Sequence, residues 1–348
     1  MKILSLKFNS WKMLLNLTCL ITIGQLVLNF VHEVEITSGW TERTDIAVIR
    51  LPKKIYVKQG DVQRQTIDQV VKTGDRVEIR LGYNGKLRTE FRGYVASSPA
   101  PRLPLEITCE DEMFQLKRKQ VKSRTFESAT VSQLISYIAP GYKTEVLNSQ
   151  LGKFAIGTHG PETASQILDR LESEAGLRSF FRYDSDGEPV LVVGKPYLWV
   201  ISEQAPVLPE VIYVLAGKQG NTVGNTLKYV RSEDRRVKVQ ARLLKDDGKT
   251  IKAKFEGDVD GEVRTLHYYA ITEEELEKKA REDYQRFKRD GYDGDIVGFG
   301  WPHTQSGQIV QVVDTMYEQR KARFFIDRVK VNFGVSGFRR TNTIGFSA

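Results

Sequence analysis

The feature of this sequence that most restricts its fold is an alternation of apolar and polar residues near the N-terminus. Every second residue of this stretch is apolar, and the set comprises Leu15, Leu17, Cys19, Ile21 and Ile23. A β-strand places such residues on one face, whereas a helix spreads them around its circumference. The alternation changes phase at Gly24 and resumes from Leu26 to Ile36, which predicts a turn or bulge between two half-buried strands.

Further short strands follow in the same part of the chain. Residues 45–51 and 76–81 alternate in the same way. Asn84-Gly85 then leads into another alternating segment, residues 89–95, and this dipeptide accepts the positive φ angles of a tight hairpin turn. Short strands linked by turns are typical of a small barrel or sandwich, so we predict a first β-barrel domain over residues 13–104.

A proline-rich segment, Ser97 to Pro104, ends this β-rich part because proline cannot donate to a sheet ladder. Beyond it the pattern changes to α+β, and we predict an α+β middle region over residues 105–205. A second linker near Gln204 to Pro209 precedes another strand-rich stretch. We predict a second β-barrel domain over residues 206–348, with a helical segment inserted at about residues 272–291. The predicted fold class is therefore α+β and multi-domain, with two small β-barrels flanking an α+β region.

Three segments carry helix signals. Residues 131–139 repeat apolar side chains at helical spacing. The segment from Pro161 to Ala175 does the same, with Pro161 suited to a first helical turn and Gly176 suited to the C-terminal cap. The helix predicted near the C-terminal end begins after Thr272, and Glu275 completes a capping box with it.

The apolar stretch from Met13 to Phe30 follows three lysines and superficially resembles a signal peptide or a membrane anchor. Polar residues interrupt it, no small-residue cleavage site follows, and its period of two indicates a strand. We therefore predict no membrane association and interpret residues 1–12 as an N-terminal extension, with Met13 as an alternative start. An exported protein with a cleaved N-terminus remains the alternative, and N-terminal sequencing distinguishes the two.

Composition excludes few classes of protein, and the charge is distributed unevenly along the chain. The 348 residues suit two to four domains, with ordinary apolar and charged fractions. Of the net charge of +8, all lies in residues 1–125, which hold 21 Lys+Arg and 13 Asp+Glu. Such a surplus could favour an acidic protein, a membrane surface or nucleic acid as partner, but the charges are scattered through strand-like segments, so we interpret them as a solvated basic face. Cys19 and Cys109 lie far apart, and we expect free thiols in a reducing compartment.

No pattern in the sequence predicts a catalytic, cofactor or metal site. The four histidines, His32, His159, His267 and His303, have no zinc-type spacing, and we interpret His32 as a core residue on an apolar strand face. No nucleophile elbow is present, and the acidic clusters near residues 184–188, 258–262 and 290–295 fit turns better than calcium loops. Gly217 to Gly224 lacks the Lys-Ser/Thr of a phosphate loop. We therefore predict that the protein is not an enzyme.

Several short motifs are informative as an ordered set. They comprise Phe91 to Val95, Ile107 to Asp111, Ser165 to Gly176 with Leu177 to Phe181, Gly220 to Tyr229, Gly298 to Pro302, Ser306 to Val310 and Phe325 to Val329. Their order and spacing, over roughly residues 15 to 345, resemble the phage late control D proteins. These form the baseplate hub family of contractile tails, in Mu-like and T-even phages, and are related to the N-terminal part of type VI spike proteins.

The resemblance implies a structural protein of the virion, assembled in the host cytoplasm. In that family each chain carries two tube-forming barrels, and three chains close into a ring. The homotrimeric ring adapts the sixfold tail tube to the threefold central spike, so the implied partners are a tail spike protein and a tail tube or tube-initiator protein. The lumen would let DNA pass without specific binding. The sequence has no evident lysozyme or spike extension after Ala348, and no cofactor or metal is implied.

Two further hypotheses concern surfaces. We expect Phe299, Trp301 and Pro302 to lie on a loop at an assembly contact. A single-stranded nucleic-acid binder is the second functional class, because Tyr83, Phe91 and Tyr94 are interleaved with Arg80, Arg88 and Arg92. Rings that fill a barrel core or line its rim explain the same residues. An exported, cell-wall-active protein is the third class.

Overall fold

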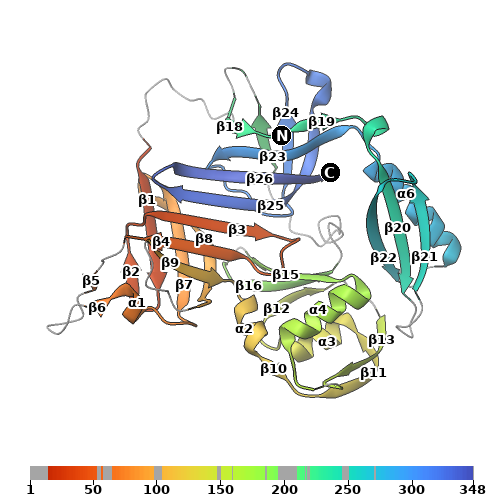
Figure 1. Ribbon diagram of the computed structural model, residues 1–348, viewed down its shortest axis with the longest axis horizontal. Coiled ribbons are helices and arrows are strands. Elements are labelled where there is room, and N and C mark those ends of the chain that lie inside the picture. Colours follow the sequence, from red (N-terminus) through yellow and green to blue (C-terminus); the bar gives the residue numbers. More distant parts are fainter. Residues whose placement is uncertain are drawn as a thin grey trace.

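The structure is a computed structural model that describes residues 15–52, 56–57, 65–97, 104–146, 150–158, 160–184, 186–194, 210–215, 217, 220–244, 251–269 and 272–347. It has three parts: a large twisted β-sheet, an α+β middle region below it, and a small lobe at one end (Figure 1). The predicted N-terminal extension, residues 1–12, and most of both predicted linkers lie outside the described residues.

The N-terminal part of the chain supplies the first block of strands. These are β1 (Leu17–Ile23), β2 (Leu26–Leu28), β3 (Glu33–Gly39), β4 (Ile46–Leu51), β7 (Arg76–Tyr83), β8 (Lys86–Val95) and β9 (Leu105–Glu110), with the short β5 (Tyr56–Val57), β6 (Gln65–Thr66) and α1 (Ile67–Val70) between them. The predicted turn at Gly24 is confirmed, with φ of 56°. The predicted hairpin is also confirmed, because Asn84 and Gly85 both have positive φ, as a tight turn between β7 and β8 requires.

The C-terminal part of the chain supplies the second block. Its strands are β17 (Val211–Val214), β18 (Thr222–Asn225), β19 (Lys228–Val230), β23 (Gly291–Phe299), β24 (Ile309–Val313), β25 (Ala322–Gly334) and β26 (Gly337–Ser347), with the 3₁₀ turns η1 (Ser232–Asp234) and η2 (Glu318–Arg320). Within this block, β25 pairs with β24 and β26, and β23 pairs with β26 and β18, all in antiparallel fashion.

The two blocks share one 14-stranded sheet, which the sequence analysis did not predict. The junction is an antiparallel ladder between β3 and β25, in which Ile36 lies opposite Val331. Buried residues of both blocks belong to one continuous apolar core. The strand pairings among the described residues do not close either block into a barrel; instead, β25 serves both blocks (Figure 1).

In the second block, one side chain replaces a missing strand ladder. β17 pairs with β24 but forms no ladder with β18 among the described strands. The Asn221 side chain accepts a hydrogen bond from the Val214 amide at 2.8 Å and donates one to the Ile212 carbonyl at 2.8 Å. The backbone amide of Asn221 also donates a hydrogen bond to the Val214 carbonyl. Because a side-chain amide has the same donor and acceptor as a peptide group, Asn221 joins β17 to the segment that leads into β18.

The middle region contains both helices and strands, as the sequence predicted. It comprises α2 (Met113–Arg118), β10 (Gln120–Val121), β11 (Arg124–Thr130), α3 (Val131–Ile138), β12 (Lys143–Val146), β13 (Gln150–Ile156), β14 (Glu162–Thr163), α4 (Ala164–Ala175), β15 (Arg178–Tyr183) and β16 (Pro189–Gly194). Both predicted helices and the left-handed cap at Gly176 are confirmed. Pro161 does not begin α4, however, because Thr163 forms a capping box with Gln166 and fixes the start at Ala164.

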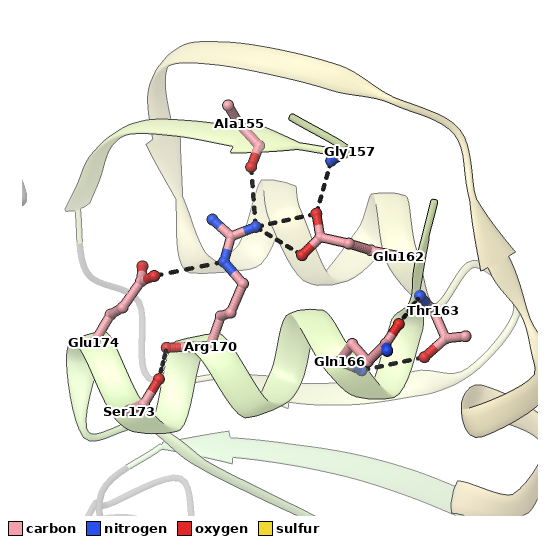
Figure 2. Close-up of polar contacts among 8 residues, drawn as sticks. All are labelled: Ala155, Gly157, Glu162, Thr163, Gln166, Arg170, Ser173 and Glu174. Atoms are coloured by element: carbon pink, nitrogen blue, oxygen red, sulfur yellow. Dashed lines mark hydrogen bonds and ion pairs between the residues drawn. The ribbon is translucent and has the colours of Figure 1, made fainter. Parts of the chain in front are cut away.

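A polar cluster fixes the segment that leads into α4 (Figure 2). The Arg170 guanidinium donates to the Ala155 carbonyl at 3.1 Å and to both carboxylate oxygens of Glu162, at 2.9 and 3.1 Å. Glu162 in turn accepts a hydrogen bond from the Gly157 amide at 2.7 Å. These groups bond to one another, so we interpret the cluster as structural support for β13, β14 and α4.

The lobe is inserted between β19 and β23. It consists of β20 (Val237–Leu244), β21 (Ile251–Gly257) and β22 (Glu262–Tyr269), which form their own sheet, and α6 (Glu273–Phe287) packed on one face of it. The predicted capping box of Thr272 and Glu275 is confirmed. The predicted helical segment is therefore one part of an inserted lobe that also contains three strands. None of the helices described here has the length and apolar character needed to cross a membrane.

Candidate assembly surface and its buried support

A bulge in β8 directs one carboxylate from the first block toward the second. Ile79 of β7 lies opposite Phe91, but the next residue, Arg80, lies opposite Thr89, so Glu90 is the extra residue. A bulge changes the direction of the side chain that it adds. The Glu90 carboxylate meets Arg340 of β26, with both oxygens 2.7 Å from Nη2. Only 3% of the Glu90 side chain and 1% of the Arg340 side chain are exposed.

The same arginine also holds the loop that follows β23. Arg340 donates from Nη1 to the Thr304 carbonyl at 3.1 Å and from Nε to the Gly300 carbonyl at 3.4 Å. Thr304 donates its hydroxyl to the side chain of Asn342, whose Nδ2 donates to the Tyr213 hydroxyl at 2.9 Å. Because nearly all of this network is buried, the loop has one fixed position.

Electrostatics keep the buried pair ionised. Burial alone would raise the pKa of Glu90, but the positive charge of Arg340 and the contact with His303 outweigh it, so the pKa lies below its usual value. His303 Nδ1 lies 3.4 Å from the Glu90 carboxylate. Burial lowers the pKa of His303, and Arg340 and Arg88 add to this effect against the opposing influence of Glu90. We therefore interpret His303 as a neutral imidazole that lies beside the ion pair of Glu90 and Arg340.

The end of β23 and the loop after it present two aromatic side chains to solvent. Phe299 is 42% exposed and Trp301 is 59% exposed, and Pro302 follows Trp301 through a cis peptide bond. The Tyr83 hydroxyl donates to the Phe338 carbonyl at 3.1 Å and accepts from the Gly300 amide at 3.2 Å. A Cβ on Gly300 would lie 2.1 Å from the Phe338 ring, so only glycine fits. Of the three predicted contact residues, Phe299 ends β23, whereas Trp301 and Pro302 lie on the loop that these hydrogen bonds anchor.

Other apolar and basic side chains lie on or beside β1, β8 and β26. Leu17 lies opposite Tyr83 in the β1–β7 ladder, and Leu17 and Leu15, on the same strand face, are both exposed. The Arg339 guanidinium lies 5.2 Å from the Phe299 ring, and Lys86 and Arg88 are exposed at the start of β8. Among the described residues, neither Lys86 nor Arg88 has an ion-pair partner.

A cavity of about 390 Å³ lies between β8, the middle region and the loop after Trp301. Two carboxylates, the buried Asp111 and the half-buried Asp45, contribute to its lining. Asp111 accepts hydrogen bonds from the Met113 amide at 2.9 Å and the Asp45 amide at 3.2 Å, and Asp45 accepts from the Gly39 amide at 3.2 Å. Backbone amides therefore donate hydrogen bonds to both carboxylates at the points where the chain leaves the sheet. We interpret the role of the two carboxylates as structural.

Removing the ionisable group at Asp111 should reduce the pH dependence of stability. Burial raises its pKa to about 7, above the roughly 3.9 of an unfolded aspartate, and the pKa of Asp45 is raised by burial and by Asp111. A carboxyl group whose pKa is raised in the folded state stabilises that state fully below about pH 4. This stabilisation is lost as the pH rises through about 7. In urea unfolding, Asp111→Asn should therefore lose less stability than the parent protein between pH 4.5 and pH 8.

The exposed Asp68→Asn provides the control and should keep the parent pH profile. Glu42, Glu110 and Lys117 also act on the carboxyl pair, and all three remain in both variants. An unchanged slope in Asp111→Asn would show that this carboxyl group does not titrate with a raised pKa.

The other candidate residues are dispersed. His303 joins the buried network, whereas His159 and the side chain of His267 lie outside the described residues. The interpretation of His32 as a core residue is wrong, because it is exposed in the turn between β2 and β3. The alternation was read as one strand, but β2 ends at Leu28 and the chain turns before β3 begins. No cluster of metal-ligating side chains occurs within the described ranges.

The rings proposed for base stacking do not form an exposed platform. Phe91 is buried, Tyr94 stacks on Phe114 at 5.5 Å between ring centroids, and Tyr83 packs against Phe338 at 5.3 Å. Arg92 is engaged by Glu78 at 2.9 Å. The explanation by core and rim packing therefore accounts for these residues better than the nucleic-acid hypothesis does.

Comparison with solved structures now relates this architecture to known proteins. The tail protein from Neisseria meningitidis MC58 matches with a TM-score of 0.61 and 15% identity, over 95% of this chain and 96% of that one. The 43 kDa tail protein of prophage MuSo2 from Shewanella oneidensis matches with a TM-score of 0.59 and 15% identity, over 95% and 98%. The chain has the fold of phage tail proteins.

A third match extends the fold beyond phages. The E. coli c3393 protein, a type VI secretion component with structural similarity to T4 tail proteins, gives a TM-score of 0.54 at 11% identity, over 94% of this chain and 77% of that one. The resemblance to the hub family is thus confirmed at the level of the fold. No family model and no curated protein matches the sequence.

Proposed function

We propose that the protein is the structural baseplate hub of a contractile phage tail or a related injection device. In this proposal three copies close into a ring that adapts the sixfold tail tube to the threefold central spike. The observation that carries it is the match along almost the whole chain to tail proteins, without a large unmatched segment in either chain. The protein would act in the virion as a subunit rather than as an enzyme.

The internal arrangement of the chain supports this function. Both β-blocks contribute strands to the 14-stranded sheet, one from each end of the sequence. Three copies would present six such blocks, which suits a sixfold partner on one side and a threefold partner on the other. We propose that each block acts as one tube-forming module, as the hub family implies, and that the lumen lets DNA pass without specific binding.

The partners in this proposal are a tail spike protein and a tail tube or tube-initiator protein. Phe299, Trp301 and Pro302 are proposed to lie at an assembly contact. Exposed aromatic residues bordered by arginine are the residue types that dominate binding energy in protein interfaces. The rigid anchoring of their loop lowers the entropy lost on binding.

Light scattering on the purified protein, alone and mixed with its cognate spike protein, tests the proposal. We expect three copies of the 39.6 kDa chain per particle, either in the protein alone or in its complex with the spike. Trp301→Ser should weaken this assembly while leaving thermal unfolding of the chain nearly unchanged, because the side chain is mostly exposed. A chain that stays monomeric with the spike at micromolar concentration would contradict the proposed function.

A further inference from the structure

The sheet of the lobe has one covered face and one open face. The covered face carries the core of the lobe, which comprises Val237, Val239, Ala241, Leu243, Leu276 and Ala280. Side chains alternate along a strand, so Lys238, Gln240 and Arg242 of β20 lie on the other face. Figure 1 shows α6 packed against one side of this sheet, at the opposite end of the molecule from β1. We call the side without the helix the open face.

Exposed apolar side chains lie on the open face beside these polar residues. Phe255 of β21 lies opposite Gln240, and Val263 of β22 lies opposite Lys238, so both belong to the open face. Phe255 is 54% exposed and Val263 is 53% exposed. A sheet face that meets only water is usually polar, whereas neighbouring exposed apolar side chains are typical of a contact surface. The open face therefore has an apolar centre.

The charges of the three strands are divided between the two faces. Glu256 and Glu262 are the carboxylates of these strands, and both lie opposite core residues of β20, on the covered face. The open face carries the cations Lys238 and Arg242 instead. No carboxylate among the described residues pairs with either cation. The two lie four positions apart in β20, a distance of about 13 Å along the strand.

Hydrogen bonds at the root of the lobe hold this surface in place. Arg235, which precedes β20, donates to the Arg289 carbonyl at 2.8 Å and to the Asp293 carboxylate at 2.9 Å. Arg235 thereby joins the segment that enters the lobe to the segment that leaves it. A surface that is fixed before binding loses less entropy when a partner binds.

The contact between Lys238 and Phe255 favours one kind of partner. The Lys238 ammonium lies 5.2 Å from the centre of the Phe255 ring, where it occupies a ring face on which a nucleic-acid base would stack. The open face of a second copy would bring like charges together, which opposes binding. Carboxylates, by contrast, would pair with both cations while an apolar side chain between them packs on Phe255 and Val263.

We propose that the open face of the lobe docks an acidic segment of a partner protein. The segment is extended and carries carboxylates at positions i and i+4, which match the spacing of Lys238 and Arg242. The side chain at position i+2 points the same way, and it is apolar and packs on Phe255 and Val263. This contact is separate from Phe299, and it does not require the ring of the proposed function.

Short fluorescent peptides test this surface in the full-length protein. The probe contains Glu-Thr-Leu-Thr-Glu between Gly-Ser flanks, and matched peptides replace both glutamates with glutamine or with lysine. Fluorescence anisotropy should show binding of the acidic peptide with Kd below about 1 mM, and at least about tenfold weaker binding of the other two. Lys238→Glu with Arg242→Glu should reverse this preference, so that the lysine peptide binds and the acidic peptide does not.

A second variant and a matched control keep the test independent of folding. Phe255→Ser removes the apolar centre and should weaken binding of the acidic peptide by about fivefold, since the exposed ring contributes little to the fold. Lys72→Glu with Lys122→Glu makes the same change of charge at exposed positions outside the lobe and should leave binding unchanged. Circular dichroism and thermal unfolding of each variant check that the chain remains folded.

The remaining outcomes would overturn this assignment. No binding of the acidic peptide up to about 1 mM, or equal binding by the parent and by Lys238→Glu with Arg242→Glu, would contradict it. Tighter binding of a thymidine oligonucleotide that the same double variant loses would assign the open face to nucleic acid. Self-association that this variant loses would assign the open face to a second copy. The peptide measurement is made whatever the number of copies in the particle, so failure of the ring would leave its result standing.

Discussion

Replacing Arg340 with methionine should destabilise the protein by about 3–5 kcal/mol, because it leaves the Glu90 carboxylate buried without a counter-charge. Arg340 also donates to the carbonyls of Gly300 and Thr304, so the loop after β23 loses its anchor in the same variant. Urea unfolding monitored by tryptophan fluorescence measures the change. Arg339→Met is the matched control, because that neighbour is only half-buried and should cost less than about 1 kcal/mol.

A double variant distinguishes the two sources of this cost. Glu90→Leu with Arg340→Met removes both charges, and replacing a buried ion pair by apolar side chains is often neutral. The double variant should therefore recover part of the stability that Arg340→Met alone loses, with the rest reflecting the loop anchor. A single variant as stable as the parent would show that the pair contributes nothing across the two blocks.

The second large effect is expected at Trp40, where the middle region packs against the sheet. Trp40 is 6% exposed and lies in a cluster with Phe180, Val190, Val192 and Phe325, and its Nε1 donates to Asp327 at 3.2 Å. Trp40→Ala should cost about 3–5 kcal/mol, since it removes a large buried ring and leaves a cavity. Calorimetry should show a lower melting temperature or a separate transition for the middle region.

Trp301→Ala is the control for this substitution, since it removes the same side chain from the surface. It should change the free energy of unfolding by less than about 0.5 kcal/mol. Equal losses in the two variants would contradict the packing described for Trp40.

Local features of this fold were predictable because their signals lie within a few residues of one another. The Asn84-Gly85 turn and the capping box of Thr272 with Glu275 were found in this way. The start of α4 was misplaced because Pro161 also suits a first turn, whereas the reciprocal bonds of Thr163 and Gln166 decide the position. His32 was misplaced because a turn preserved the apparent alternation by chance.

Long-range features left no readable pattern in the sequence. Glu90 and Arg340 are separated by 250 residues, and neither lies in a motif that marks it as a partner of the other. The β8 bulge that aims Glu90 arises from the pairing with β7, which no single-strand pattern contains. Of the candidate surface, the sequence therefore indicated Phe299, Trp301 and Pro302, but not the network that holds their loop.

The β3–β25 ladder has a mechanical consequence for a protein of this kind. Inter-strand hydrogen bonds run across the strands, so a pull along the strand direction strains all seven register positions from Arg328 to Gly334 together. Such a ladder resists sliding of the two strands past each other far better than it resists a peeling force, because peeling breaks one hydrogen bond at a time. A push received by one block would therefore pass to the other as a rigid displacement, without hinging between them.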